Sequence, residues 1–219
     1  RSASTDQGAL LNHPAQKTRQ TSNEIVFANC SRVQEALRVL EEFSRQSDPD
    51  LAKIAAIIRF EIYEFELTVF KANRKNIRIN LLNTCNLCLI TTPTKDLISI
   101  VSSALSAGIK MVQYRCKSSN DQIKISEVLQ LASICKDNGA LFIINDRVDF
   151  ALAADADGVH LGQNDIPIEI ARKILGEERL IGRSTHNLNQ LQRAKDEGCD
   201  YLGAGPVFPT KNKPQETIS

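Results

Sequence analysis

Short apolar runs alternate with helix-length amphipathic segments from about residue 86 onward, and this alternation limits the fold more than any other feature. Strict strand–helix alternation indicates right-handed βαβ units and a parallel sheet covered by helices. Units of roughly 20–30 residues favour a (β/α)8 barrel, and no GxGxxG turn of a dinucleotide-binding sheet follows the first strand. The predicted strands are Leu87–Thr91, Met111–Arg115, Leu141–Asn145, Gly158–Leu161, Leu180–Ser184 and Tyr201–Gly205.

Helices are expected between these strands, and glycines at or near helix C-caps support their boundaries. Because a complete barrel has eight strands, the sequence predicts an incomplete (β/α)8 TIM barrel of about six strands over residues 86–219. Two further units are expected downstream of Ser219. The predicted helices are Lys95–Ala107, Gln122–Asn138, Val148–Ala154, Ile168–Leu175 and Leu188–Glu197, and the glycines are Gly108, Gly139, Gly176 and Gly198.

The first third of the chain has a different pattern. Apolar residues recur every three or four positions in residues 24–46 and 51–72, which predicts two amphipathic helices. Ser22 or Asn23 is expected to cap the first helix, and Pro49 to begin the second. We therefore predict a small all-α hairpin domain over residues 1–75 and a linker over 76–85. A solvated or salt-bridged face explains the charged residues Arg38, Glu41, Glu42, Arg59 and Glu61.

Composition excludes several classes of protein. Lys and Arg number 27 against 26 Asp and Glu, so a surface for duplex nucleic acid is not expected. No apolar run approaches the ~20 residues of a membrane helix, and no apolar signal-peptide core opens the sequence. A cytoplasmic protein is expected, with homo-oligomerisation left open. The start on Arg1 suggests that an upstream segment is missing.

Six cysteines fit a reducing compartment, because most lie in apolar patterns. Cys85 and Cys88 have CxxC spacing. A zinc site needs a second pair of ligands at similar spacing, and none follows. We do not predict a metal or redox role for this pair.

Polar and charged residues follow the apolar core of each predicted strand. The carboxyl ends of parallel strands in a barrel converge on one face, where these side chains would form one site. Mg²⁺ takes one or two carboxylates with phosphate oxygens and water, while Arg and Lys neutralise the remaining phosphate charge. A magnesium–pyrophosphate ligand fits this chemistry, with Asp146 and Asp165 holding the metal. Other rim candidates are Gln113, Arg115, Lys117, Asn145, Gln163, Ser184, His186, Thr210, Asn212 and Lys213.

Each candidate also has a structural alternative. Asp146 could cap the helix that starts near Val148, and Asp165 could organise the turn before Pro167. Arg115 and Lys117 could pair with those two carboxylates as structural ion pairs. His160 is better explained as a hydrogen-bonded core imidazole than as a catalyst. His186 is as well explained by the start of a helix as by contact with a substrate.

Long segments of the sequence resemble thiamine-phosphate synthases in order and spacing. They are VQYRCK (112–117), INDRVDFALAADADGVHLGQNDIP (144–167) and IGRSTHNLNQLQRAKDEGCDYLGAGPVFPT (181–210), followed by Lys213. The resemblance runs from about Asn86 to Lys213. Residues 32–43 resemble the amino-terminal extension of some bacterial, particularly cyanobacterial, members.

This resemblance implies a reaction in which 4-amino-2-methyl-5-hydroxymethylpyrimidine diphosphate and a thiazole phosphate give thiamine phosphate and pyrophosphate. It implies Mg²⁺ on Asp146 and Asp165. It also implies pyrophosphate contacts from Arg115, Lys117, Asn145 and Lys213, pyrimidine contacts from Gln113 and Ser184, and a thiazole-phosphate contact from Thr210. Arg115, Lys117, Ser184 and Lys213 would act in the chemical step. Asn212 stands where the family usually has Thr, so that phosphate contact is altered.

Two other functions remain open at this stage. A thiazole tautomerase, a related barrel, would not need two carboxylates and a cationic clamp. An inactive binding or scaffold protein would use the hairpin for docking. Titration with pyrophosphate separates these functions from the transferase.

Overall fold

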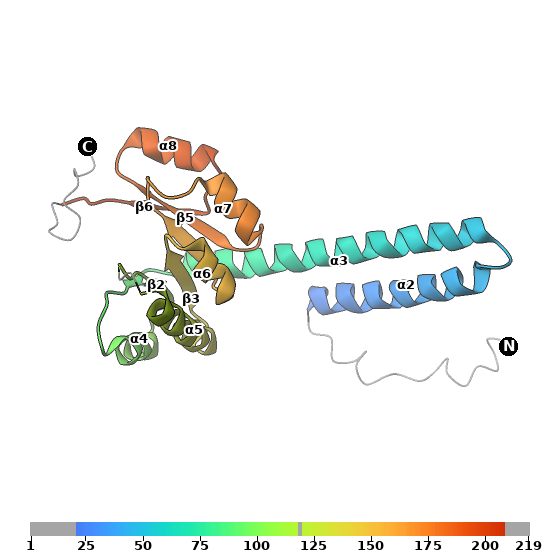
Figure 1. Ribbon diagram of the computed structural model, residues 1–219, viewed down its shortest axis with the longest axis horizontal. Helices are drawn as coiled ribbons and strands as arrows, with labels where there is room; N and C mark the ends of the chain where they lie inside the picture. The colour runs from blue at the N-terminus through green and yellow to red at the C-terminus, as the bar shows by residue number, and fades with distance from the viewer. Residues whose placement is uncertain (1–20, 118–119, 209–219) are drawn as a thin grey trace. The chain divides into compact units, whose positions relative to one another are not determined.

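The computed structural model describes residues 21–117 and 120–208, and it divides the chain into two units, Arg1–Phe70 and Lys71–Ser219 (Figure 1). In the first unit, α2 (Ser22–Ser44) and the start of α3 (Pro49–Thr84) form the predicted hairpin. The cap of α2 is Thr21, whose hydroxyl accepts the Glu24 N–H at 3.3 Å, rather than Ser22 or Asn23. The Asp48 carboxylate accepts the Leu51 N–H at 3.0 Å and begins α3.

Small and polar residues and one aromatic pair, Phe27 and Phe70 with ring centroids 6.2 Å apart, form the contact between the two hairpin helices. Cys30 and Ala55 are buried there, and close approach of two helices needs such small side chains. Arg59 pairs with Glu41 at 2.9 Å, and Gln34 donates to Glu66 at 2.7 Å. The prediction of a salt-bridged face is therefore confirmed for Arg59 and Glu41.

The predicted linker over residues 76–85 is wrong, because α3 continues to Thr84. No proline or glycine lies between residues 50 and 92 to end the helix. Its last turns carry Ile79, Leu81 and Leu82, which pack against the sheet of the second unit. The boundary between the units falls at Phe70 and Lys71, inside this helix.

The second unit contains six parallel strands in the order β1 to β6 within the described residues. Helices connect them, as the alternation predicted, and the sheet curls into an incomplete barrel (Figure 1). The strands are β1 (Leu89–Ile90), β2 (Met111–Tyr114), β3 (Leu141–Asn145), β4 (Gly158–Leu161), β5 (Leu180–Thr185) and β6 (Tyr201–Ala204). The helices are α4 (Leu97–Ser106), α5 (Asp121–Asp137), α6 (Val148–Ala153), α7 (Ile168–Leu175) and α8 (Leu188–Asp196). The four glycines predicted near helix ends have positive φ angles.

Alternating side chains separate the two faces of the sheet. Val112, Phe142 and Ile144 belong to the main core, which also contains residues of α4 to α7. Met111 and Ile143 face the other way and belong to the cluster that the end of α3 covers. Helices α4 to α7 and the end of α3 therefore pack against opposite faces of the sheet.

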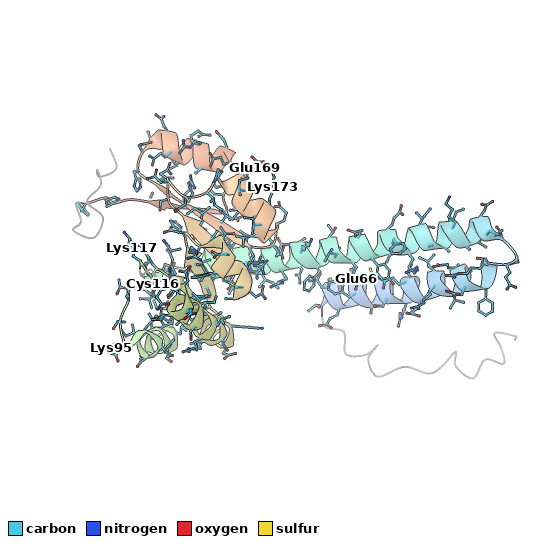
Figure 2. All side chains as sticks on the ribbon, viewed as in Figure 1. Glu66, Lys95, Cys116, Lys117, Glu169 and Lys173 are labelled. Atoms are coloured by element: carbon cyan, nitrogen blue, oxygen red, sulfur yellow. The ribbon has the colours of Figure 1, made fainter. Side chains whose placement is uncertain are left out.

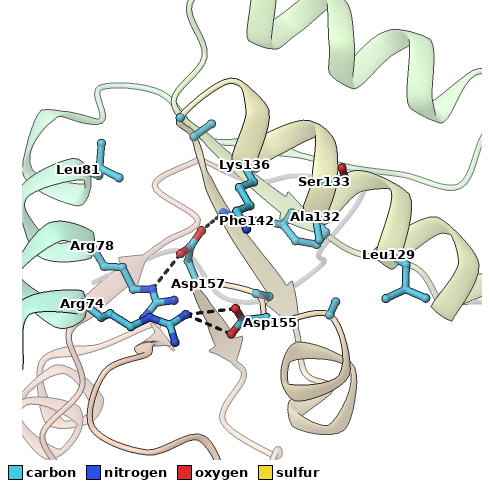
Figure 3. A pocket seen from close by; sticks show the side chains of 14 residues that line it. Arg74, Arg78, Leu81, Leu129, Ala132, Ser133, Lys136, Phe142, Asp155 and Asp157 are labelled. Atoms are coloured by element: carbon cyan, nitrogen blue, oxygen red, sulfur yellow. Dashed lines mark hydrogen bonds and ion pairs between the residues drawn. The ribbon is translucent and has the colours of Figure 1, made fainter. Parts of the chain in front are cut away.

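Charged residues fix the end of α3 to the amino ends of two strands. Arg78 Nε lies 2.8 Å from Asp157, whose other oxygen accepts the Phe142 N–H at 3.0 Å (Figure 3). Lys75, three residues earlier, lies 2.7 Å from Asp200, whose other oxygen accepts the Ile181 N–H at 2.8 Å. Each aspartate precedes a strand and satisfies a backbone donor of the neighbouring strand.

We expect Arg78→Ala to lower the free energy of unfolding by about 2 kcal/mol. Arg78 is 5% exposed and also donates to the Glu178 carbonyl at 3.0 Å, so its loss leaves buried groups unpaired. Lys173→Ala is the control, because the Lys173–Glu169 pair lies on an exposed face of α7 (Figure 2) and should contribute below ~1 kcal/mol. Urea denaturation measures both, and equal losses would contradict the assigned contact.

Candidate active site

The carboxyl ends of β1, β2 and β3 are joined by hydrogen bonds between polar side chains and backbone. Gln113 is 6% exposed and donates from Nε2 to Asn145 Oδ1 at 2.8 Å. The Arg115 N–H donates to the Thr91 hydroxyl at 3.0 Å. Gln113 and Asn145 thus lie side by side, as predicted. Thr91 was not predicted as a site residue. Its position directly after β1 is the sequence feature that could have identified it.

Arg115 and Lys117 follow β2, and Lys117 is exposed (Figure 2). Within residues 21–117 and 120–208 neither forms a salt bridge, so the alternative of structural ion pairs with Asp146 and Asp165 is not observed. Cys116 packs against the helix-covered core. Their side chains are therefore not held in a salt bridge by any described residue.

Asp146 follows β3 in a left-handed conformation, with φ of 65°. Its N–H donates to the His160 carbonyl at 3.0 Å, which ties the end of β3 to β4. It does not cap α6, because the N-cap residue of that helix is Arg147. A non-glycine residue in this region costs about 1 kcal/mol, and such conformations concentrate at functional sites.

Asp165 organises the turn after β4, as its structural alternative predicted. Its Oδ2 accepts the Gly162 N–H at 2.6 Å, which leaves the second carboxylate oxygen for another contact. Asp146 and Asp165 therefore follow neighbouring strands of one sheet.

The chemistry of these donors fits Mg²⁺. Within the part of the chain that the structure describes, no three His, Cys, Asp or Glu side chains gather as a metal site. Two carboxylates alone suit an ion that keeps water and phosphate oxygens as its other ligands, and they do not suit a zinc site made only of protein. Cys85 and Cys88 are free thiols.

His160 lies inside the barrel as the hydrogen-bonded imidazole that was predicted. It is 9% exposed, with Nε2 at 2.9 Å from the Ser184 hydroxyl and Nδ1 at 3.2 Å from the Tyr201 hydroxyl. These three residues and Gln113 line a cavity of about 470 Å³. Tyr201 was not predicted as a site residue. It is the first residue of β6, and strand alternation places its side chain on the inner face of the sheet.

Of the other residues predicted at the site, the structure describes His186 and Gln163. His186 Nδ1 donates to the Gly205 carbonyl oxygen at 2.5 Å, while Asn187 caps α8. Gln163 donates to the Ser184 carbonyl. Thr210, Asn212 and Lys213 lie outside the described residues.

Arg147 belongs to the segment 144–167, and no function was predicted for it. Its guanidinium pairs with Asp121 at 3.0 Å and with Asp149, and it stacks on Phe150 at 3.9 Å. Hydrogen bonds from Arg147, and then from Lys124, lower the pKa of Asp121 to about 2. Arg147 therefore joins the start of α5 to the start of α6.

This pairing predicts a pH dependence. A carboxyl whose pKa is lowered by folding stabilises the protein above its unfolded pKa of about 3.8, and the contribution disappears as pH falls toward 2. The stability difference between the native protein and Arg147→Gln should therefore shrink between pH 5 and pH 2, as measured by urea denaturation. A difference that stays constant over this range would contradict the pairing.

Comparison with known proteins identifies the second unit. The family model described as "Thiamine monophosphate synthase" matches residues 87–218. The chain belongs to the thiamine monophosphate synthase family. A second model, described as "ThiD2 family", matches residues 1–68. The resemblance of the barrel segments is thus confirmed.

Members of this family from cyanobacteria match almost the whole chain. A thiamine-phosphate synthase of Prochlorococcus marinus (strain MIT 9313) is 56% identical over 98% of this chain and 62% of its own length. A thiamine-phosphate synthase of Thermosynechococcus vestitus is 47% identical over 98% of this chain and 61% of its own length. The chain therefore spans less than two thirds of the length of these curated relatives.

A solved structure of the family supports the fold. Thiamine phosphate pyrophosphorylase from Pyrococcus furiosus is similar with a TM-score of 0.53 and 39% identity, covering 56% of this chain and 61% of that chain. None of the described helices is long and apolar enough to cross a membrane.

Proposed function

We propose that the full-length protein is a transferase that joins 4-amino-2-methyl-5-hydroxymethylpyrimidine diphosphate to a thiazole phosphate, releasing pyrophosphate. The observation that carries this proposal is the set of acids, cations and amides at the carboxyl ends of adjacent parallel strands. Its chemistry suits a diphosphate better than an uncharged ligand. We expect a cytoplasmic enzyme that acts on small molecules.

In this proposal the chain's own residues bind and orient the diphosphate. Asp146 and Asp165 would hold Mg²⁺, which when bound neutralises phosphate charge and favours departure of pyrophosphate. Arg115, Lys117 and Lys213 would contact the phosphate oxygens, and Asn145, oriented by Gln113, would donate a further hydrogen bond.

The inner face of the barrel would hold the pyrimidine. Gln113 and Ser184 line the cavity beside its apolar wall, where exclusion of water protects a cationic intermediate from hydrolysis. Thr210 and Asn212 would contact the thiazole phosphate. The thiazole nitrogen forms the new bond to carbon, so this step needs no general base. Positioning and charge stabilisation would supply most of the rate enhancement.

Calorimetric titration with pyrophosphate tests whether the acids, cations and amides at the strand ends bind a diphosphate. We expect binding that strengthens at least ~10-fold when Mg²⁺ is added, because the metal offsets charge between the ligand and the two carboxylates. Absence of binding under both conditions would favour a scaffold protein. Isomerisation of a thiazole by a protein that shows no Mg²⁺-dependent diphosphate binding would favour the tautomerase.

A further inference from the structure

Three side chains from consecutive strands form a hydrogen-bonded chain inside the barrel. Tyr201 of β6 contacts His160 Nδ1 at 3.2 Å, and His160 Nε2 contacts Ser184 of β5 at 2.9 Å. The two rings pack with centroids 5.5 Å apart. Ser184 is 8% exposed and lines the 470 Å³ cavity, so the chain ends at the space where a ligand would bind.

Two glycines provide the space for this chain. A Cβ at Gly182 would lie 2.2 Å from the Tyr201 ring, and a Cβ at Gly203 would lie 2.9 Å from the His160 ring. Both distances are shorter than van der Waals contact, so a side chain at either position would displace a ring. The residues of β5 and β6 therefore accommodate the Tyr–His pair.

The direction of the hydrogen bonds follows from the available donors and acceptors. Burial raises the pKa of the Tyr201 hydroxyl, which therefore stays protonated. Within the described residues this hydroxyl has one hydrogen-bond partner, His160 Nδ1. If Tyr201 donates to Nδ1, the imidazole proton is on Nε2 and is donated to the Ser184 oxygen. The Ser184 proton is then directed to another acceptor.

The opposite direction places the unshared proton on Tyr201 in place of Ser184. An imidazole with its proton on Nδ1 would donate to the Tyr201 oxygen, and the Tyr201 proton would have no acceptor among the described residues. The half-buried Tyr201 hydroxyl would then be a donor without a partner in the described part of the chain. The first arrangement instead leaves the unshared proton on the Ser184 hydroxyl, which lines the cavity and can donate it to a ligand.

We propose that Tyr201 and His160 are positioning residues that hold Ser184 as a hydrogen-bond donor toward the cavity. The ligand atom at Ser184 is then an acceptor, either a diphosphate oxygen or a pyrimidine ring nitrogen. This inference rests on the proposed function for its ligand, but the imidazole tautomer can be measured without any substrate. It assigns a purpose to His160 that does not require proton transfer to the substrate.

Nitrogen NMR of the full-length protein labelled at histidine tests the tautomer directly. We expect His160 to carry its proton on Nε2, and Tyr201→Phe to increase the Nδ1–H population. A native His160 with its proton on Nδ1 would overturn the proposal, whether or not the transferase activity is found.

Kinetics test whether Tyr201 acts through Ser184. Tyr201→Phe should lower kcat about 10-fold and change KM less than 2-fold, since one oriented hydrogen bond is lost. The double variant Tyr201→Phe with Ser184→Ala should be no slower than Ser184→Ala alone. Additive losses would overturn the proposal.

Tyr114→Phe is the matched control for a lost hydroxyl. Tyr114 donates to Glu127 at 2.6 Å on the helix-covered side of the sheet. Its kcat per folded protein should be unchanged, and a loss equal to that of Tyr201→Phe would count against the assigned chain. Binding of pyrophosphate and of the free pyrimidine alcohol to Ser184→Ala shows whether the acceptor is a diphosphate oxygen or a pyrimidine nitrogen. The substitution should weaken binding only of the ligand that Ser184 contacts.

Discussion

Replacing Asp146 or Asp165 with asparagine is expected to lower turnover about 100- to 1,000-fold at saturating substrate. Each change removes one negative charge from the proposed Mg²⁺ site while keeping the size of the side chain. Asn tolerates the left-handed backbone at position 146. At position 165 its amide oxygen can still accept the Gly162 N–H. Loss of rate would therefore reflect loss of charge and not collapse of the turn.

Steady-state kinetics with varied Mg²⁺ measure this effect. The concentration of Mg²⁺ that gives half-maximal rate should rise in both variants, whereas Asp137→Asn, an exposed residue of α5, should leave it unchanged. Asp165→Ala should add a loss of stability that Asp165→Asn does not show. Unchanged turnover in both Asp→Asn variants would refute the metal site.

Gly158→Ala is expected to lower the free energy of unfolding by about 3 kcal/mol. Gly158 begins β4 and pairs with Leu180 of β5. A Cβ at this position would lie 2.1 Å from the Leu180 carbonyl oxygen. A backbone atom in the middle of the sheet cannot move as a side-chain tip can, so the strands must separate.

Gly198→Ala is the comparison for Gly158→Ala. Gly198 has φ of +79° with no heavy atom within 4 Å of an added Cβ, so it tests backbone strain alone, which costs about 1 kcal/mol. Urea denaturation of the full-length protein measures both variants. A loss at Gly158 no larger than that at Gly198 would show that β4 and β5 can adjust.

Local sequence patterns predicted most of the second unit. Apolar residues recur with different periods in its strands and helices, and glycines lie near the ends of the helices. Leu141–Asn145, Gly158–Leu161 and Ile168–Leu175 have the predicted bounds. The end of α3 was missed, since Asn, Lys and Arg there resemble a linker. Those charges pair with Asp157 and Asp200, which lie 79 and 125 residues later in the sequence. Such distant pairing leaves no periodic signal.

The polar rim was also predictable in part. Residues at the ends of successive parallel strands must converge, so the meeting of Gln113 with Asn145 follows from strand order. The partners of His160 do not, because a hydrogen bond between β4 and β6 depends on two glycines that provide the space for their rings. Arg147 was missed because its two carboxylate partners lie on separate helices.

The most direct test of the proposed transferase is its product balance. The full-length protein should be incubated with Mg²⁺, the pyrimidine diphosphate and the thiazole phosphate, and both products quantified by phosphorus NMR. We predict one pyrophosphate for each thiamine phosphate, and no thiamine phosphate when either substrate is omitted. Isomerised thiazole without pyrophosphate, or no reaction with both substrates bound, would contradict the account.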